Sequence, residues 1–239
     1  MMPHDKPICG LSRLTVTRIF GLLAAGGLTM GLVTALLIVP SDAIQGEVQR
    51  IMYIHVPMAW NTYLAFAVVC FCSMAYLWTR NSAWDRRAAA SAEIGVVFTA
   101  LTISAGSIWG RPTWGTWWTW DARLTTTAIL LFIYIGYLVV RQVVEEPERR
   151  ARLATVIGII GFLDVPLIRL SVMWWRTLHQ QPTVFRPGGM TIDRFMFFTL
   201  LLNLLAFGCL YLYLMLKRTE LEVVRESLLV EQARRIAHE

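Results

Sequence analysis

The sequence has little charge and little cysteine: charged residues make up 16% of its 239 positions, and only four cysteines occur. No C-x-x-C or C-x-x-C-H pattern is present, which excludes the usual dithiol redox motif and covalent attachment of a c-type haem to this chain. A G-x-x-x-x-G-K-[ST] loop is also absent, so ATP hydrolysis by that route is excluded. The net charge of +6 contains no long basic block, and we expect no nucleic-acid partner.

Apolar residues are abundant instead, at 56% of the chain, and the mean hydropathy is strongly positive. They occur in runs of about 20 residues, the length at which an α-helix crosses a bilayer. The pattern predicts an all-α integral membrane protein with six transmembrane helices in a single domain over residues 1–239. The predicted spans are residues 19–39, 57–79, 92–109, 125–140, 153–174 and 195–216.

The first apolar run resembles a signal peptide, because basic residues precede it. It exceeds the usual ~7 to 15 apolar residues, and no A-x-A cleavage site follows, so we interpret it as a retained anchor. Basic residues predict the orientation, with both termini in the cytoplasm. With six spans they fall on one side: Lys6, Arg13, Arg18, Arg80, Arg86, Arg87, Arg141, Arg149, Arg150, Arg152, Lys217 and Arg218.

Three segments then face the other side of the membrane. They are residues 40–56, the Trp-rich segment 110–124 between the third and fourth helices, and the loop 175–194. Residues 217–239 form a charged cytoplasmic tail, for which we expect a helix. The unusual chemistry of the sequence is therefore predicted to gather at the external face.

The Trp-rich segment and the residue before it read W-G-R-P-T-W-G-T-W-W-T-W-D, which places five of the ten tryptophans in twelve positions. An interfacial aromatic belt needs one or two such rings at a helix end, so this density favours a platform for a planar ligand. A short helix beginning at Pro112 would put four side chains on one face. These are Trp114, Trp117, Trp118 and Asp121, and the other two tryptophans of the cluster are Trp109 and Trp120.

Two of the four histidines belong to the predicted external face: His55 in Y-I-H-V-P-M-A-W and His179 in W-W-R-T-L-H-Q-Q-P. A single interfacial histidine is commonly a hydrogen-bonding anchor, and that interpretation stays open for each. Two beside a tryptophan platform favour axial ligation of a haem iron. Zinc fits less well, because no external cysteine completes a four-ligand site.

Charged residues beside the cluster have two interpretations each. Arg111 and Arg123 flank the tryptophans and could bind haem propionates, or they could extend to the interface or pair with Asp121. Asp164 lies inside the fifth predicted span, near Pro166 and Arg169. An ionisable residue there is functional by default, yet it could equally satisfy polar groups freed by the proline or pair with the arginine.

The stretch W-G-R-P-T-W-G-T-W-W-T-W-D-A-R-L-T resembles the WWD signature of the haem-handling proteins of cytochrome c maturation. Within that superfamily the chain resembles the CcmC family, haem exporter protein C, because I-H-V-P-M-A-W and W-W-R-T-L-H-Q occur in the expected order. The resemblance covers roughly residues 15–217.

This resemblance implies a function. Family members are multi-pass proteins of the bacterial inner membrane, in contact with its lipid, and they hold haem b non-covalently and transiently at the periplasmic face. The WWD segment contacts the ring, and His55 and His179 are the axial ligands. The haem is presented to the chaperone CcmE, assisted by the small membrane protein CcmD, and the loaded chaperone is released with the ABC-type subunits CcmA and CcmB. No residue of the chain itself need be catalytic, because positioning the haem is the task.

Two other classes remain as alternatives. A permease moving haem or another small molecule would need polar residues spread through its spans, where Asp164 is nearly alone. An electron-transfer cytochrome b would bind its haem inside the helical bundle, whereas these two histidines lie at helix ends.

Overall fold

The computed structural model describes residues 12–175, 177–180, 183–184 and 188–236, which are entirely helical apart from turns and one isolated bridge. Six helical segments are long and apolar enough to cross a membrane, as predicted. The elements are α1 (Arg13–Val33) with a π-helical turn (Thr34–Ile38), a 3-10 turn (Glu47–Ile51), α2 (Met52–Thr79), α3 (Ser82–Trp114), α4 (Ala122–Val143), α5 (Pro147–Phe162), α6 (Asp164–Trp174) and α7 (Arg194–Ile236).

The helices extend beyond the apolar runs that predicted them, because capping groups rather than hydropathy set their ends. Asn81 caps the start of α3 by accepting a hydrogen bond from the Ala83 N–H, ten residues before the predicted span. The helix α2 likewise begins before Pro57, so that His55 lies in its first turn. The predicted tail continues α7 without a break as far as Ile236.

The prediction of a short helix beginning at Pro112 was wrong. Pro112 lies in the last turn of α3, which ends at Trp114, and Gly115 takes the left-handed conformation with a φ of +78°. A glycine there is a common helix terminator because it has no Cβ to clash. Residues 115–121 are not helical, so Trp114 and the later tryptophans do not share one helix face.

The fifth span is broken at Leu163, between α5 and α6. Pro166 has no N–H to donate to the Phe162 carbonyl, and its ring clashes with that group, which accounts for the break. Asp164 begins α6 and is buried, and one carboxylate oxygen lacks a hydrogen-bond partner among the described residues. Asp164 and Arg169 stand five positions apart on different faces of α6, and no ion pair joins them.

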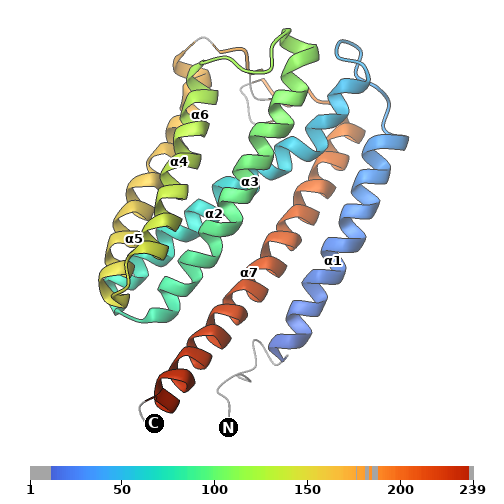
Figure 1. Cartoon of the computed structure of the whole chain (residues 1–239). Helices are drawn as coiled ribbons and strands as arrows, with labels where there is room; N and C mark the ends of the chain where they lie inside the picture. The colour runs from blue at the N-terminus through green and yellow to red at the C-terminus, as the bar shows by residue number, and fades with distance from the viewer. Residues whose placement is uncertain (1–11, 176, 181–182, 185–187, 237–239) are drawn as a thin grey trace.

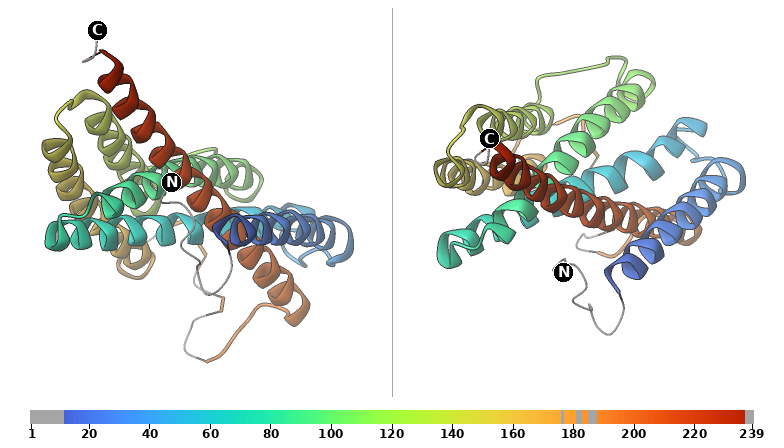
Figure 2. Two further views of the ribbon diagram at one scale, coloured as in Figure 1. Left: turned by 90° about the horizontal axis from the view of Figure 1, so that it is seen from below. Right: turned by 60° about the horizontal axis from the view of Figure 1, so that its bottom comes forward.

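The bundle is held together by close helix contacts. The main core lies where α2, α3, α4, α5 and α6 meet, and Phe66 stacks on Tyr134 there. Figure 1 and Figure 2 show α1 running beside the first part of α7. A Cβ at Gly31 of α1 would lie 2.6 Å from the Asn203 side-chain oxygen of α7, so glycine permits this approach. The Asn203 amide also donates to the Gly31 carbonyl at 3.1 Å.

The two ends of the bundle differ. The α1–α2, α3–α4 and α6–α7 connections lie at one end, which we call the loop end (Figure 1). The beginning of α1 and the end of α7 lie at the other, the terminal end. The described parts of the three segments that the sequence grouped on one face therefore lie at the same end of the bundle.

Candidate functional site

His55 is held firmly against α3. Its Nδ1 lies 3.0 Å from the Thr102 carbonyl oxygen. A carbonyl only accepts, so Nδ1 carries the proton and Nε2 keeps a free lone pair. The close approach depends on Gly106, where a Cβ would lie 2.9 Å from the His55 Cε1 atom. The helix pair α2 and α3 therefore fixes both the orientation and the tautomer of this imidazole.

Trp109 supports His55 from the side and is itself held by the first connection. The two rings meet edge to face with centroids 5.8 Å apart, and the Trp109 indole N–H donates to the Gln45 side-chain oxygen at 2.9 Å. Asp42 fixes Gln45 in a turn, because its Oδ1 accepts the N–H groups of Ile44 and Gln45, both at 2.8 Å. Sequence reasoning missed Gln45, although an Asp opening a turn was a readable signal.

His179 reaches the site from the α6–α7 connection. Its ring meets Trp114 edge to face at a centroid distance of 5.0 Å. Asp121 ties this connection to α4: one carboxylate oxygen caps α4 by accepting the Leu124 N–H at 2.9 Å, and the other accepts the Leu178 N–H at 3.3 Å. The second oxygen lies 4.0 Å from the His179 Nδ1, too far for a hydrogen bond.

The surroundings of His179 favour its neutral form. Burial, followed by the charge of Arg123 and then by His55, lowers the pKa of His179 to about 3. A lowered pKa means that the imidazole holds no proton charge at neutral pH. Neutral imidazole is the form that binds metals, so His179 is ready to act as a ligand.

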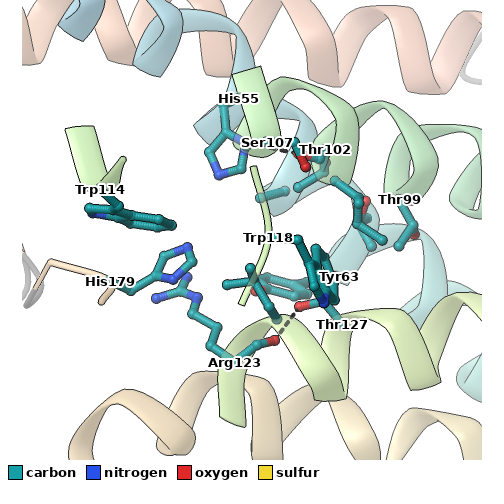
Figure 3. Close-up of a pocket in the computed structure, with 15 residues that line it drawn as sticks. His55, Tyr63, Thr99, Thr102, Ser107, Trp114, Trp118, Arg123, Thr127 and His179 are labelled. Carbon is teal, nitrogen blue, oxygen red and sulfur yellow. Dashed lines mark hydrogen bonds between the residues drawn. The ribbon is translucent and has the colours of Figure 1, made fainter. Parts of the chain in front are cut away.

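The two histidines line one cavity with Trp114, Trp118 and Arg123 (Figure 3). The empty space in and in front of it, including the part open to solvent, is about 570 Å³. Figure 3 shows the imidazoles facing each other, with Trp114 on one side and Trp118 on the other. The remaining wall is formed by Ala59, Thr62, Tyr63, Thr99, Thr102, Ile103, Gly106, Ser107, Leu124 and Thr127.

The other predicted residues lie outside this wall. Trp117 and Trp120 are 58% and 79% exposed, and Trp120 packs edge to face on Trp118 at 5.5 Å. Arg111 is exposed and donates to the Gly115 carbonyl at the end of α3. Their predicted contacts with a ligand therefore stay predictions.

The donor set fits an iron porphyrin better than a bare metal ion. Across the described part of the chain, no group of three or more His, Cys, Asp or Glu side chains could hold a metal. A porphyrin supplies four nitrogens to its iron and leaves two axial positions, which two facing imidazoles can fill. Aromatic walls beside those imidazoles suit the flat ring.

Comparisons with known proteins agree with these features. A family model described as "CcmC: Heme exporter protein C" matches residues 6–234. The Heme exporter protein C of Bradyrhizobium diazoefficiens is 41% identical over 201 residues, which cover 83% of this chain and 76% of that relative. The Heme exporter protein C of Haemophilus influenzae is 35% identical over 94% of this chain and 92% of its own. A putative ccmC-like mitochondrial protein of Marchantia polymorpha is 39% identical over 66% and 67%, respectively.

Proposed function

The chain belongs to the heme exporter protein C (CcmC) family of cytochrome c maturation, and from this membership we propose that it binds haem b between His55 and His179 and presents it to the periplasmic chaperone CcmE. The observation that carries the proposal is the pair of imidazoles facing each other across an aromatic cavity (Figure 3). The chain is a multi-pass membrane component that handles haem.

The chain's own residues would act by positioning. His55 and His179 would hold the iron from opposite faces, while Trp114 and Trp118 would limit rotation and tilt of the ring. A bound ring with one edge outside the cavity leaves a vinyl group accessible to the chaperone's histidine. Fixing that geometry removes most of the entropic cost of the encounter, so no acid or base from this chain is required.

The distribution of basic residues supports the proposed orientation in the membrane, and a missing motif supports a need for partner subunits. Most of the basic residues near the helix ends lie toward the terminal end, and from the positive-inside rule we expect that end in the cytoplasm and the loop end in the periplasm. The chain has no phosphate loop, so release of loaded CcmE by nucleotide hydrolysis would depend on CcmA and CcmB, with CcmD as the small accessory subunit.

The test is haem transfer from full-length protein in lipid nanodiscs to purified CcmE, read as covalently bound haem on CcmE after denaturing electrophoresis. We expect His55→Ala and His179→Ala to lower transfer at least about tenfold. Trp78→Ala is the matched surface control, because Trp78 lies at the other end of α2 and is 91% exposed. Undiminished transfer by a variant lacking both histidines would reject the proposal.

The permease alternative gains no support from the cavity. Its described lining residues on α2 and α3 are confined to residues 55–63 and 99–114, in the half of each helix next to the loop end. A pathway across the membrane would also require lining residues from the other half.

A further inference from the structure

The two imidazoles of the cavity differ in what holds their Nδ1 atoms. The Nδ1 of His55 has the Thr102 carbonyl oxygen at 3.0 Å, and both residues belong to long helices, α2 and α3. The Nδ1 of His179 is buried but has no hydrogen-bond partner among the described residues. His179 also lies on a non-helical connection (Figure 3). One of the two candidate ligands is therefore left without support at its Nδ1.

The partner of this nitrogen must be an acceptor when the ring is a ligand. A neutral imidazole that binds a metal through one nitrogen carries its proton on the other. In His179 the buried Nδ1 is the nitrogen that lies near Asp121, which leaves Nε2 for an iron and the proton on Nδ1. Metal-bound histidines almost always donate this second N–H to a carboxylate, a backbone carbonyl or a water, and a buried donor without an acceptor is costly.

Asp121 has an acceptor oxygen within reach. Its Oδ2 lies 4.0 Å from the His179 Nδ1, and its side chain is only 9% exposed. Oδ1 caps α4 through the Leu124 N–H, whereas Oδ2 accepts only the Leu178 N–H, at 3.3 Å. A carboxylate oxygen can accept two hydrogen bonds, so Oδ2 has room for the His179 N–H as well. A shift of about 1 Å would bring the two atoms to hydrogen-bond distance.

The other polar neighbours of His179 fit this role less well. The Arg123 guanidinium, which lines the same cavity, can only donate. The Thr177 hydroxyl already accepts the backbone N–H of His179 at 3.2 Å. Trp114 meets the His179 ring edge to face, and an indole nitrogen is a donor without an acceptor lone pair. Asp121 is therefore the best acceptor that the described residues offer.

We propose that Asp121 is the positioning residue of His179: its Oδ2 accepts the Nδ1–H of His179 when this histidine serves as a ligand, while its Oδ1 continues to cap α4. The inference rests on the proposed function. Asp121 would fasten the α6–α7 connection to the start of α4 and direct Nε2 into the cavity. It would do for His179 what the Thr102 carbonyl does for His55.

The two supports differ in charge, which makes the two ligands unequal. Thr102 offers a neutral carbonyl, whereas Asp121 offers a carboxylate, whose hydrogen bonds are about twice as strong as neutral ones. A carboxylate partner raises the basicity of a ligating imidazole. A more basic ligand stabilises ferric iron more than ferrous iron, because the ferric ion has the larger charge. Asp121 should therefore lower the reduction potential of bound haem.

The experiment measures haem affinity by Soret titration and the midpoint potential by spectroelectrochemistry, with full-length protein in nanodiscs. Asp121→Asn keeps one oxygen to cap α4, because asparagine caps helices as well as aspartate does. We expect it to bind haem about tenfold more weakly and to raise the midpoint potential. Asp193→Asn is the matched control, with both values unchanged. Asp193 lies near the end of the same connection and caps α7 by accepting the N–H groups of Phe195 and Met196 at 2.8 and 3.2 Å, but it does not line the cavity.

The midpoint potential decides the outcome. An unchanged potential in Asp121→Asn, with or without weaker binding, would overturn the inference, because a purely structural cap would leave the potential unchanged. An equal rise in Asp193→Asn would overturn it as well. The spectrum of the parent separates this inference from the proposed function. A parent without a low-spin, bis-imidazole spectrum would reject His55 and His179 as ligands, whereas a low-spin parent whose potential is matched by Asp121→Asn would reject only the role of Asp121.

Discussion

Arg123 in the cavity and the arginines near the terminal end have different surroundings. At the terminal end, Arg141 forms a two-point ion pair with Asp85 at 2.6 and 2.9 Å, and Arg218 binds the carboxylates of Glu93 and Glu222. At the loop end, Arg123 lines the cavity without a carboxylate partner among the described residues.

This difference separates structural from ligand-binding roles. When a buried charged side chain only holds two helices together, a residue of opposite charge in the same protein pairs with it, because an unpaired buried charge is costly. A chain that binds an external group leaves donors open until the group arrives. The ion pairs of the terminal end therefore need no ligand, whereas the open donors and facing imidazoles of the loop end indicate one.

The largest effect on haem binding is expected from the axial histidines. Replacing His179 by alanine should lower haem affinity by at least about 100-fold, the upper range seen when a mere supporting partner of a metal ligand is lost. His55→Ala should act similarly. Soret titration in nanodiscs measures both, and an affinity within twofold of the parent would remove the ligand role of that histidine.

A smaller effect is expected at Gly106, which lets His55 approach α3. In Gly106→Ala the new Cβ would lie 2.9 Å from the His55 Cε1 atom and displace the ring. Overpacking costs about 1–3 kcal/mol, which corresponds to roughly tenfold weaker haem binding. Gly136→Ala is the matched control on α4, because a Cβ there has no neighbour within 4 Å. Equal affinities of the two variants would show that the fit at Gly106 does not matter.

A still smaller effect is expected at Gln45, which acts on the site only through Trp109. Gln45→Leu removes the acceptor for the indole N–H and should weaken haem binding about threefold, the net value of a neutral hydrogen bond. Gln45→Glu retains an acceptor oxygen and should restore the parent's affinity and Soret maximum. If the glutamate and leucine variants behave alike, the hydrogen bond is not what positions Trp109.

A substitution at the terminal end should lower the stability of the protein without changing haem binding. Asp85→Asn leaves the Arg141 guanidinium without its charged partner, and breaking a buried pair costs about 3–5 kcal/mol. We expect a lower melting temperature of the nanodisc-bound protein and an unchanged haem Kd. A changed Kd would show that the ion pair at the terminal end also affects the haem site, which would contradict a purely structural role for it.

Much of this arrangement was readable from the sequence. Hydropathy located the six spans. Basic connections alternate with connections that have few basic residues, and this alternation placed His55 and His179 at the same end. Both patterns are carried by many residues, so local exceptions do not disturb them. The helix ends were less readable, because caps such as Asn81 lie outside the apolar runs.

Single long-range contacts were not readable. The short helix predicted from Pro112 failed because α3 continues through the proline to the glycine that ends it. Gln45 contacts a residue 64 positions away, and Asp121 joins α4 to a connection 57 positions away. Such contacts depend on how the helices pack, and the local sequence around one residue does not indicate which distant residue it contacts.

The most direct test of the account is the electron paramagnetic resonance spectrum of ferric haem bound to the full-length protein in nanodiscs. We predict a low-spin, six-coordinate signal that becomes high-spin in both His55→Gly and His179→Gly and returns to low-spin when imidazole is added. A low-spin signal that survives removal of both histidines, or a high-spin signal in the parent, would contradict a haem site built between His55 and His179.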